Sequence, residues 1–428
     1  MHLIYENLIK NLVLLWTGQF KELDHDGQGY RVADAVWATI GNASKKSKST
    51  IPSTYGAAPR DPVNERSQMT ADNWSFWAMY LGPIFLERKF TNAAFYSHFI
   101  DLVELINICL QFDMKRSDIQ IVREGFEKWV ANYERLYFQY DLDRLSACPL
   151  TVHALLHIAD GIEAMGPVWA YWAFALERFC GKLGRTIKSR RSPWKNLDNR
   201  LLLAVQMTHV KNMYGLHEEL RLGPTKKGEP AVPPGTMTKI IGALATRYSP
   251  PHGKALKASI VRRHIKCARI EVWGKLRRLD GGDTMHASHV IGAHATDRRD
   301  ATFVRYEVYV DINARKRKRK IRLQLKTFYG QLQYLYLIHI PAARDLRLDH
   351  PEVVVLAAIR RCKTTRSLSR LDMHYYLEDG ELDLVDAATV QCLVARVPWR
   401  KQWVIFDRSG TVGRCEEEEG ADPGSDNE

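Results

Sequence analysis

One short segment of the chain carries residue types that metal chemistry needs. His153 and His157 are four residues apart, so on a helix both imidazoles face the same side. This spacing suits Zn²⁺, and Cys148, five residues before His153, could be a third ligand. The alternative is that both histidines are satisfied, semi-buried residues of an apolar helix. The sequence predicts the helix and leaves zinc binding as one of two interpretations.

A carboxylate and a dense basic stretch follow this segment. Residues 178–200 contain eight lysines and arginines against one acid, Asp198. Such a stretch suits contacts with the phosphates of DNA, and the alternative is a solvated charged loop. Glu177 alone cannot hold the two Mg²⁺ or Mn²⁺ ions that phosphodiester transfer uses, and it could instead pair with a neighbouring base. The candidate DNA contacts are Arg178, Lys182, Arg185, Lys188, Arg190, Arg191 and Lys195.

Two further basic segments could contact nucleic acid. The periodicity over 254–273 predicts one amphipathic helix whose candidates are Arg262, Arg263, Lys266 and Arg269. Six consecutive basic residues could form a nuclear-localisation patch, a DNA contact or only a hairpin tip, and the three interpretations stay open. They are Arg315, Lys316, Arg317, Lys318, Arg319 and Lys320.

Composition limits the class of protein. The chain has 428 residues, 45% of them hydrophobic and 26% charged, which is typical of a globular protein with two or three domains. A formal net charge of +13 favours a polyanionic partner, most simply nucleic acid, over a merely solvated basic surface. Seven scattered cysteines without a CxxC pair indicate reduced thiols. No apolar run reaches the length of a membrane-spanning helix, so no membrane partner is expected.

The elements that must position these residues are mostly helical. Apolar spacing predicts helices over 3–16, 32–43 and most of 70–222, with Thr70 as one N-cap and Ser117 with Gln120 as a capping box. Strand-like runs begin near residue 300. We therefore expect an α+β fold, mainly α-helical over the N-terminal two-thirds, with a small β-rich domain at the C-terminus. The expected segments are 1–50 helices, 51–69 connector, 70–222 helices, 223–253 Gly/Pro/Lys linker, 254–275 basic helix, 276–410 β-rich domain and 411–428 acidic disordered tail.

Several stretches resemble a known family. The segments MHLIYENLIKNLVLLWTGQFK, IPSTYGAAPR, MTADNWSFWAMYLGP and CPLTVHALLHIADGIEAMGPVWAYWAFALERFCGKL resemble the transposases of CACTA-type DNA transposons, in the version abundant in fungal genomes. TFYGQLQYLYLIHI and PWRKQWVIFDRSG resemble the β-rich region that follows the transposase core in those proteins. The resemblance covers roughly residues 1–220 and 273–410 and rests on extended similarity.

The resemblance implies a ribonuclease-H-like (DDE) core in which three acids hold two divalent metal ions. The third acid matches Glu177, the second would fall just before Met1 and the first further upstream, so residues 1–50 are expected to be helices of a truncated core and 70–222 the helical insertion with the last core helix. Relatives place a zinc-binding histidine pair about twenty residues before the last acid, as His157 precedes Glu177 here. Their partner CxxC is absent.

A transposon-derived protein that binds double-stranded DNA in the nucleus is therefore the expected function. Its ancestor would cleave DNA and transfer strands, with Mg²⁺ or Mn²⁺ as cofactor, and this chain is expected to be catalytically incomplete. The alternative is a non-enzymatic nuclear interaction protein that binds another acidic partner. A decayed product that folds poorly is a third interpretation.

Overall fold

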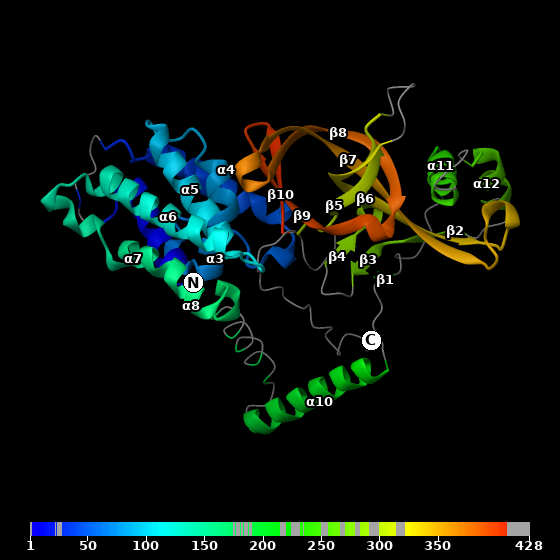
Figure 1. Cartoon of the computed structure of the whole chain (residues 1–428), viewed down its shortest axis with the longest axis horizontal. Coiled ribbons are helices and arrows are strands. Elements are labelled where there is room, and N and C mark those ends of the chain that lie inside the picture. The colour runs from blue at the N-terminus through cyan, green and yellow to red at the C-terminus, as the bar shows by residue number, and fades with distance from the viewer. Residues whose placement is uncertain are drawn as a thin grey trace. The chain divides into compact units, whose positions relative to one another are not determined.

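The computed structural model describes most of the chain as two compact units. One unit lies within residues 2–48 and 54–214, and the other within 49–53 and 220–408. The first is built from helices and the second on strands (Figure 1). The described residues are 2–21, 23, 28–173, 176, 180, 183, 187, 191–214, 220–223, 232–233, 235–249, 256–265, 270–278, 283–290, 299–313 and 322–408.

Helices form most of the described part of the first unit. Its α-helices are α1 (Lys10–Trp16), α2 (Asp34–Lys46), α3 (Ala71–Phe76), α4 (Gly82–Phe85), α5 (Ala93–Cys109), α6 (Arg116–Tyr133), α7 (Leu150–His153), α8 (Ile158–Met165) and α10 (Pro193–Met213). Its π-helical and 3-10 segments are η1 (His2–Ile9), η3 (Ser53–Tyr55), η4 (Arg66–Gln68), η5 (Trp77–Leu81), η6 (Glu134–Phe138), η7 (Leu142–Ala147), η8 (Ala154–His157) and η9 (Val168–Ala170), while η2 (Ser47–Thr50) follows α2. The helices expected over 3–16 and 32–43 are confirmed. No helix in the described part of the chain is both long and apolar enough to cross a bilayer.

Aromatic side chains make the core of the helical unit. Trp16 is fully buried, and its indole N–H donates a hydrogen bond of 2.9 Å to the hydroxyl of Tyr137. Its ring meets Phe90 and Phe99 edge to face, with centroids 5.4 and 5.3 Å apart. Edge-to-face pairs add to the free energy gained by burying the rings, so these contacts fix α1 against α5 and η6.

Local capping sets where two of these helices begin. Thr70 caps α3 as expected, since its Oγ1 accepts a hydrogen bond of 3.4 Å from the N–H of Asn73. The capping box expected at Ser117 is wrong. The Lys115 N–H donates to Asp118 Oδ2 at 2.8 Å, so α6 begins at Arg116. A carboxylate is a stronger acceptor for the first helical N–H groups than the Gln120 amide would be, which explains the earlier start.

A closed barrel of six antiparallel strands forms most of the second unit (Figure 1). The order of the strands is β6-β5-β9-β10-β8-β7, and pairing of β6 with β7 closes the barrel. A short strand, β2, adds to β6, while β1, β3 and β4 form a separate three-stranded sheet. The strands are β1 (Leu220–Gly223), β2 (Ile270–Trp273), β3 (Lys275–Arg278), β4 (Thr284–His286), β5 (Phe303–Asp311), β6 (Leu323–Ile340), β7 (Glu352–Leu368), β8 (Met373–Asp386), β9 (Val390–Trp399) and β10 (Gln402–Asp407).

Alternating residues of the long strands contribute to two separate hydrophobic cores. Leu332, Leu335 and Ile359 pack with Val304 and Leu393 in one core of the barrel. The other faces of β6 and β7 receive helices α11 (Thr236–Tyr248) and α12 (Ala258–Ile265). Because successive strand residues point to opposite faces, both surfaces of β6 and β7 can be apolar and covered. The second apolar cluster includes Ile240, Leu244, Val261, Ile265, Tyr336, Ile338, Val354 and Leu356.

The expected fold class is wrong. The strand-based unit is not small, because it reaches from 220 to 408 and includes two helices. Residues 236–248 form α11 although a linker was expected there. The expected helix over 254–273 is instead α12 followed by Ile270–Trp273, which pairs with β6. Val261, Ile265 and Val272 fit a helical period by spacing alone, yet Ile270 and Val272 also alternate as a strand does.

Candidate functional site

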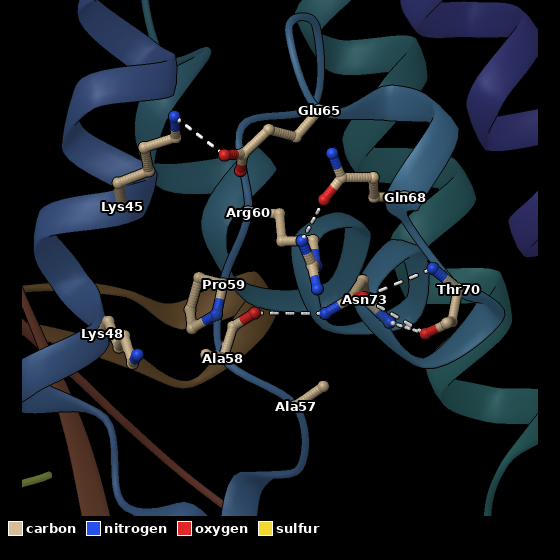
Figure 2. Close-up of a pocket in the computed structure, with 10 residues that line it drawn as sticks. All are labelled: Lys45, Lys48, Ala57, Ala58, Pro59, Arg60, Glu65, Gln68, Thr70 and Asn73. Atoms are coloured by element: carbon tan, nitrogen blue, oxygen red, sulfur yellow. Dashed lines mark hydrogen bonds and ion pairs between the residues drawn. The ribbon is translucent and has the colours of Figure 1, made fainter.

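The helical unit has a basic pocket of about 420 Å³ where the end of α2 meets the segment that leads into α3 (Figure 2). Three of the residues that line it are cations and one is a carboxylate. Three of the lining residues have small side chains, and we call this segment the floor of the pocket: Ala57, Ala58 and Pro59. The charged and polar residues of the wall are Lys45, Lys48, Arg60, Glu65, Gln68, Thr70 and Asn73.

The buried carboxylate of Asp61 stabilises the loop that lines one side of this pocket. Asp61 is 4% exposed, and its Oδ1 accepts hydrogen bonds from the N–H groups of Val63 at 2.9 Å and Asn64 at 3.1 Å. Asp61 Oδ2 accepts a third, of 2.8 Å, from Asn64 Nδ2. The same oxygen lies where a Cβ on Gly41 would be, at only 2.2 Å. Glycine in α2 is therefore what lets the loop approach that helix.

The first turn of α3 holds the opposite side of the loop. Asn73 is 5% exposed, and its Nδ2 donates a hydrogen bond of 3.2 Å to the carbonyl oxygen of Ala58. Its Oδ1 accepts one of 3.3 Å from the Thr70 N–H, which is the other half of the capping interaction. The residues that cap the helix therefore also fix the floor of the pocket (Figure 2).

The charges of the pocket are only partly balanced. Lys45 Nζ lies 3.0 Å from Glu65 Oε1, and this contact holds the pKa of Glu65 below its usual range. Arg60 Nη1 donates a hydrogen bond of 2.7 Å to Gln68 Oε1, a neutral partner. Lys48 is exposed, and Figure 2 draws no interaction from it to the other lining residues. Three cations minus one carboxylate leave a formal charge of +2, which suits an anion such as phosphate.

The histidine pair expected from the sequence is brought together. His153 and His157 are both exposed, at the ends of α7 and η8, and their Nε2 atoms are 3.3 Å apart. Two nitrogens on a tetrahedral zinc ion with bonds of about 2.05 Å would be roughly 3.3 Å apart. The separation therefore fits a zinc ion shared by both rings, and it equally fits a hydrogen bond from one ring to the other.

A complete zinc site is not found in the described part of the chain. Its His, Cys, Asp and Glu side chains form no group of three that could hold a metal ion. Cys148 is half-buried, and burial raises the pKa of its thiol, which opposes the thiolate that zinc needs. Asp160 lies 3.8 Å from His157 Nδ1, but it is bound by Arg123, which lowers its pKa. Of the expected set of Cys148, His153 and His157, the described structure brings the two histidines together, and zinc binding stays a prediction.

Four of the expected nucleic-acid contacts are described, and all four are exposed. Arg191 and Lys195 lie before and within the first turn of α10. Arg262 and Arg263 of α12 line a pocket of about 270 Å³, and Arg263 Nη2 is 3.7 Å from Asp345. The remaining candidates lie outside the described residues: Glu177, Arg178, Lys182, Arg185, Lys188, Arg190, Lys266, Arg269, Arg315, Lys316, Arg317, Lys318, Arg319 and Lys320.

The sequence does not predict the basic pocket. Residues 51–69 are polar and rich in proline, and this composition indicates a connector. One available signal was the group of lysines at the end of α2, which include Lys45 and Lys48, followed by Arg60 after Pro59. Spacing alone could not show that the loop folds back onto α2, because the contact between Asp61 and Gly41 is tertiary.

Comparisons with known proteins leave the family of the chain open. No family model, no curated protein and no solved structure matches it. The resemblance to transposases therefore stays a prediction.

Proposed function

We propose that this protein binds the phosphate backbone of nucleic acid, and that the pocket at Lys45, Lys48 and Arg60 receives one phosphate group. The observation that carries the proposal is the pocket's formal charge of +2. The excess of +13 over the whole chain supports it, because counterion release drives proteins of this charge onto polyanions. The exposed Arg191, Lys195, Arg262 and Arg263 supply further cations.

Double-stranded DNA is the partner we propose, on the strength of the resemblance to transposases.

Binding to a labelled duplex tests the proposal. The double variant Lys48→Gln/Arg60→Gln removes two positive charges from the pocket and keeps side chains of similar length. We expect its affinity to fall roughly tenfold, because each lost phosphate contact costs about 1 kcal/mol or less at moderate salt. Lys128→Gln is the control, since Lys128 is an exposed lysine of α6 in the same unit. Equal losses in the two variants would contradict a role for the pocket.

A second candidate is a protein-interaction role for the same basic surface, and one observation favours it. Helix α10 exposes large apolar side chains that phosphate binding does not need, including Leu203, Val205 and Met207 at 58%, 66% and 51%. Exposed apolar surface of this kind often marks contacts between proteins. Competition by poly-glutamate, added at the same total charge as the labelled duplex, separates the two candidates. If the pocket binds DNA, poly-glutamate should compete only weakly. If the partner is an acidic protein, poly-glutamate should displace the duplex.

A further inference from the structure

A serine, a histidine and an aspartate are linked by hydrogen bonds at the hairpin between β7 and β8. Ser367 Oγ is 2.8 Å from His374 Nδ1, and His374 Nε2 is 3.1 Å from Asp372 Oδ1. The imidazole also packs on the Tyr329 ring, with centroids 4.9 Å apart. The ring is therefore held from three sides, with one nitrogen toward the hydroxyl and the other toward the carboxylate.

Irregular pairing of β7 with β8 in this hairpin sets the direction in which these side chains point. The pairing of β7 with β8 shifts register three times between Arg360 and Arg366, and Ser367 then lies directly opposite His374. Asp372 has a φ of +51°, a left-handed conformation that aspartate and asparagine tolerate better than most residues. Bulges at barrel rims often redirect side chains at functional sites. Here they leave the three groups on one side of the hairpin.

The linked residues open onto a pocket of about 300 Å³. Ser367 is exposed, whereas the His374 side chain is only 19% exposed. Thr364 and Arg305 line the same pocket and carry hydrogen-bond donors. The Arg305 guanidinium is already paired with Glu307 at 2.7 Å and lies 3.7 Å from Asp407, so the pocket favours an uncharged ligand over an anion.

We propose that Ser367, His374 and Asp372 form a nucleophile, a general base and an orienting acid for the hydrolysis of small uncharged carboxylic esters. Ser367 Oγ attacks the ester carbonyl carbon as His374 Nδ1 takes the hydroxyl proton. The tetrahedral oxyanion collapses, the bond from carbon to the alkoxy oxygen breaks, and Nδ1–H gives its proton to the departing alcohol. Asp372 accepts the Nε2–H throughout, which fixes the tautomer and stabilises the imidazolium.

Water completes the reaction on the acyl-enzyme. His374 Nδ1 takes a proton from water as its oxygen attacks the acyl carbon. The bond from that carbon to Ser367 Oγ breaks, Oγ recovers the proton, and the carboxylic acid leaves. The sum is ester plus water giving acid plus alcohol, and no oxidant, metal or co-reactant is needed. Among the side chains that line this pocket, we assign the Thr364 hydroxyl as the hydrogen-bond donor to the oxyanion.

A fluorophosphonate probe and p-nitrophenyl acetate test this proposal on the full-length chain. We expect the probe to attach to the peptide that contains Ser367, and ester hydrolysis to saturate with substrate. Ser367→Ala should abolish both signals. Asp372→Asn keeps a residue that tolerates the left-handed backbone. It should lower the rate at least about tenfold, because the tautomer of His374 with its proton on Nε2 would no longer be fixed. Ser369→Ala is the matched control, because Ser369 is exposed in the same turn and outside the linked group.

The result that would overturn the proposal is equally specific. Hydrolysis or labelling that is unchanged in Ser367→Ala would show that other surface nucleophiles produce the signal. Ser367 is exposed, so its alanine variant should fold, and circular dichroism spectra of each variant would check this. An equal loss in Ser369→Ala and Ser367→Ala would also contradict the assignment, since it would reflect the turn and not the nucleophile.

Discussion

At the scale of single residues, a buried histidine links the stability of the helical unit to pH. His98 is 3% exposed and stacks on Trp129, with centroids 4.2 Å apart. Its Nε2 lies 3.1 Å from the Trp129 carbonyl oxygen, while the Trp129 indole N–H donates to the His98 carbonyl oxygen at 2.9 Å. Burial lowers the pKa of His98 to about 4, so the ring is neutral when folded at neutral pH.

This low pKa predicts a loss of stability in mild acid. The folded state binds fewer protons than the unfolded chain between pH 6.5 and about 4, so the free energy of unfolding should fall as the pH drops through that window. A difference of about 2.5 pKa units corresponds to about 3 kcal/mol. Thermal unfolding from pH 7 to pH 4 measures it. His98→Gln should be less stable at pH 7 yet show a flatter pH dependence, whereas the exposed His209→Gln should keep the full slope.

The histidine pair gives a second prediction at this scale. Because His153 and His157 Nε2 atoms are 3.3 Å apart, we expect the chain to bind one Zn²⁺ ion through both rings. Metal analysis after dialysis against zinc should find less of it in His153→Ala and in His157→Ala. His209→Ala is the control on α10. Equal zinc content in all four proteins would contradict the prediction and leave the pair as ordinary surface histidines.

At the scale of elements, the pocket depends on how one loop lies against α2. Asp61 satisfies backbone N–H groups of Val63 and Asn64, and Gly41 leaves room for its carboxylate. The loop therefore brings Arg60 close to Lys45 of α2 through two residues that do not themselves line the pocket.

Gly41→Ala tests this arrangement. Its Cβ would lie 2.2 Å from Asp61 Oδ2, so the loop must shift or the carboxylate must turn away. We expect a loss of stability of about 1–3 kcal/mol from overpacking and weaker DNA binding than in the parent chain. Gly242→Ala, for which an added Cβ meets nothing within 4 Å, should change neither property. Unchanged stability and DNA affinity in Gly41→Ala would show that the loop is not fixed in this way.

Local features of these elements could be predicted from the sequence, and tertiary ones could not. The cap at Thr70 depends on a residue three positions away, and it was predicted. The cap before α6 was misplaced because Asp118 competes with Gln120 for the same role. The pocket depends on a contact between residues twenty positions apart, and the barrel depends on the pairing of β6 with β7 across a shift in register. Neither the contact in the pocket nor the pairing of β6 with β7 produces a periodic pattern in the sequence.

At the scale of the whole molecule, the chain has two units with separate cores. The aromatic core around Trp16 and Phe99 belongs to the helical unit, and the core around Leu332 and Val304 belongs to the barrel unit. The barrel unit also includes residues 49–53, where Arg299 Nε and Nη2 donate to the carbonyl oxygens of Ile51 at 2.7 Å and Pro52 at 2.8 Å. A short segment from the N-terminal half thus completes the C-terminal unit.

Separate cores predict separate unfolding transitions. Leu332→Ala should destabilise the barrel unit by about 3 kcal/mol and leave the other transition in place, because it empties a fully buried site. Phe99→Leu should do the reverse. Calorimetry or denaturant titration that follows both transitions measures this. A single transition that moves equally in both variants would contradict independence of the two units.

The salt dependence of duplex binding by the whole chain is the most direct test of the central claim, that the pocket at Lys45, Lys48 and Arg60 holds a phosphate. We expect a steep fall in affinity with salt, and a slope of log affinity against log salt whose magnitude is about 0.9 smaller in Lys48→Gln/Arg60→Gln, because the pocket holds one phosphate and each neutralised phosphate contributes about 0.9. The slope of Lys128→Gln should match the wild type. No binding at low salt, or the same slope in the pocket variant and the wild type, would contradict the claim.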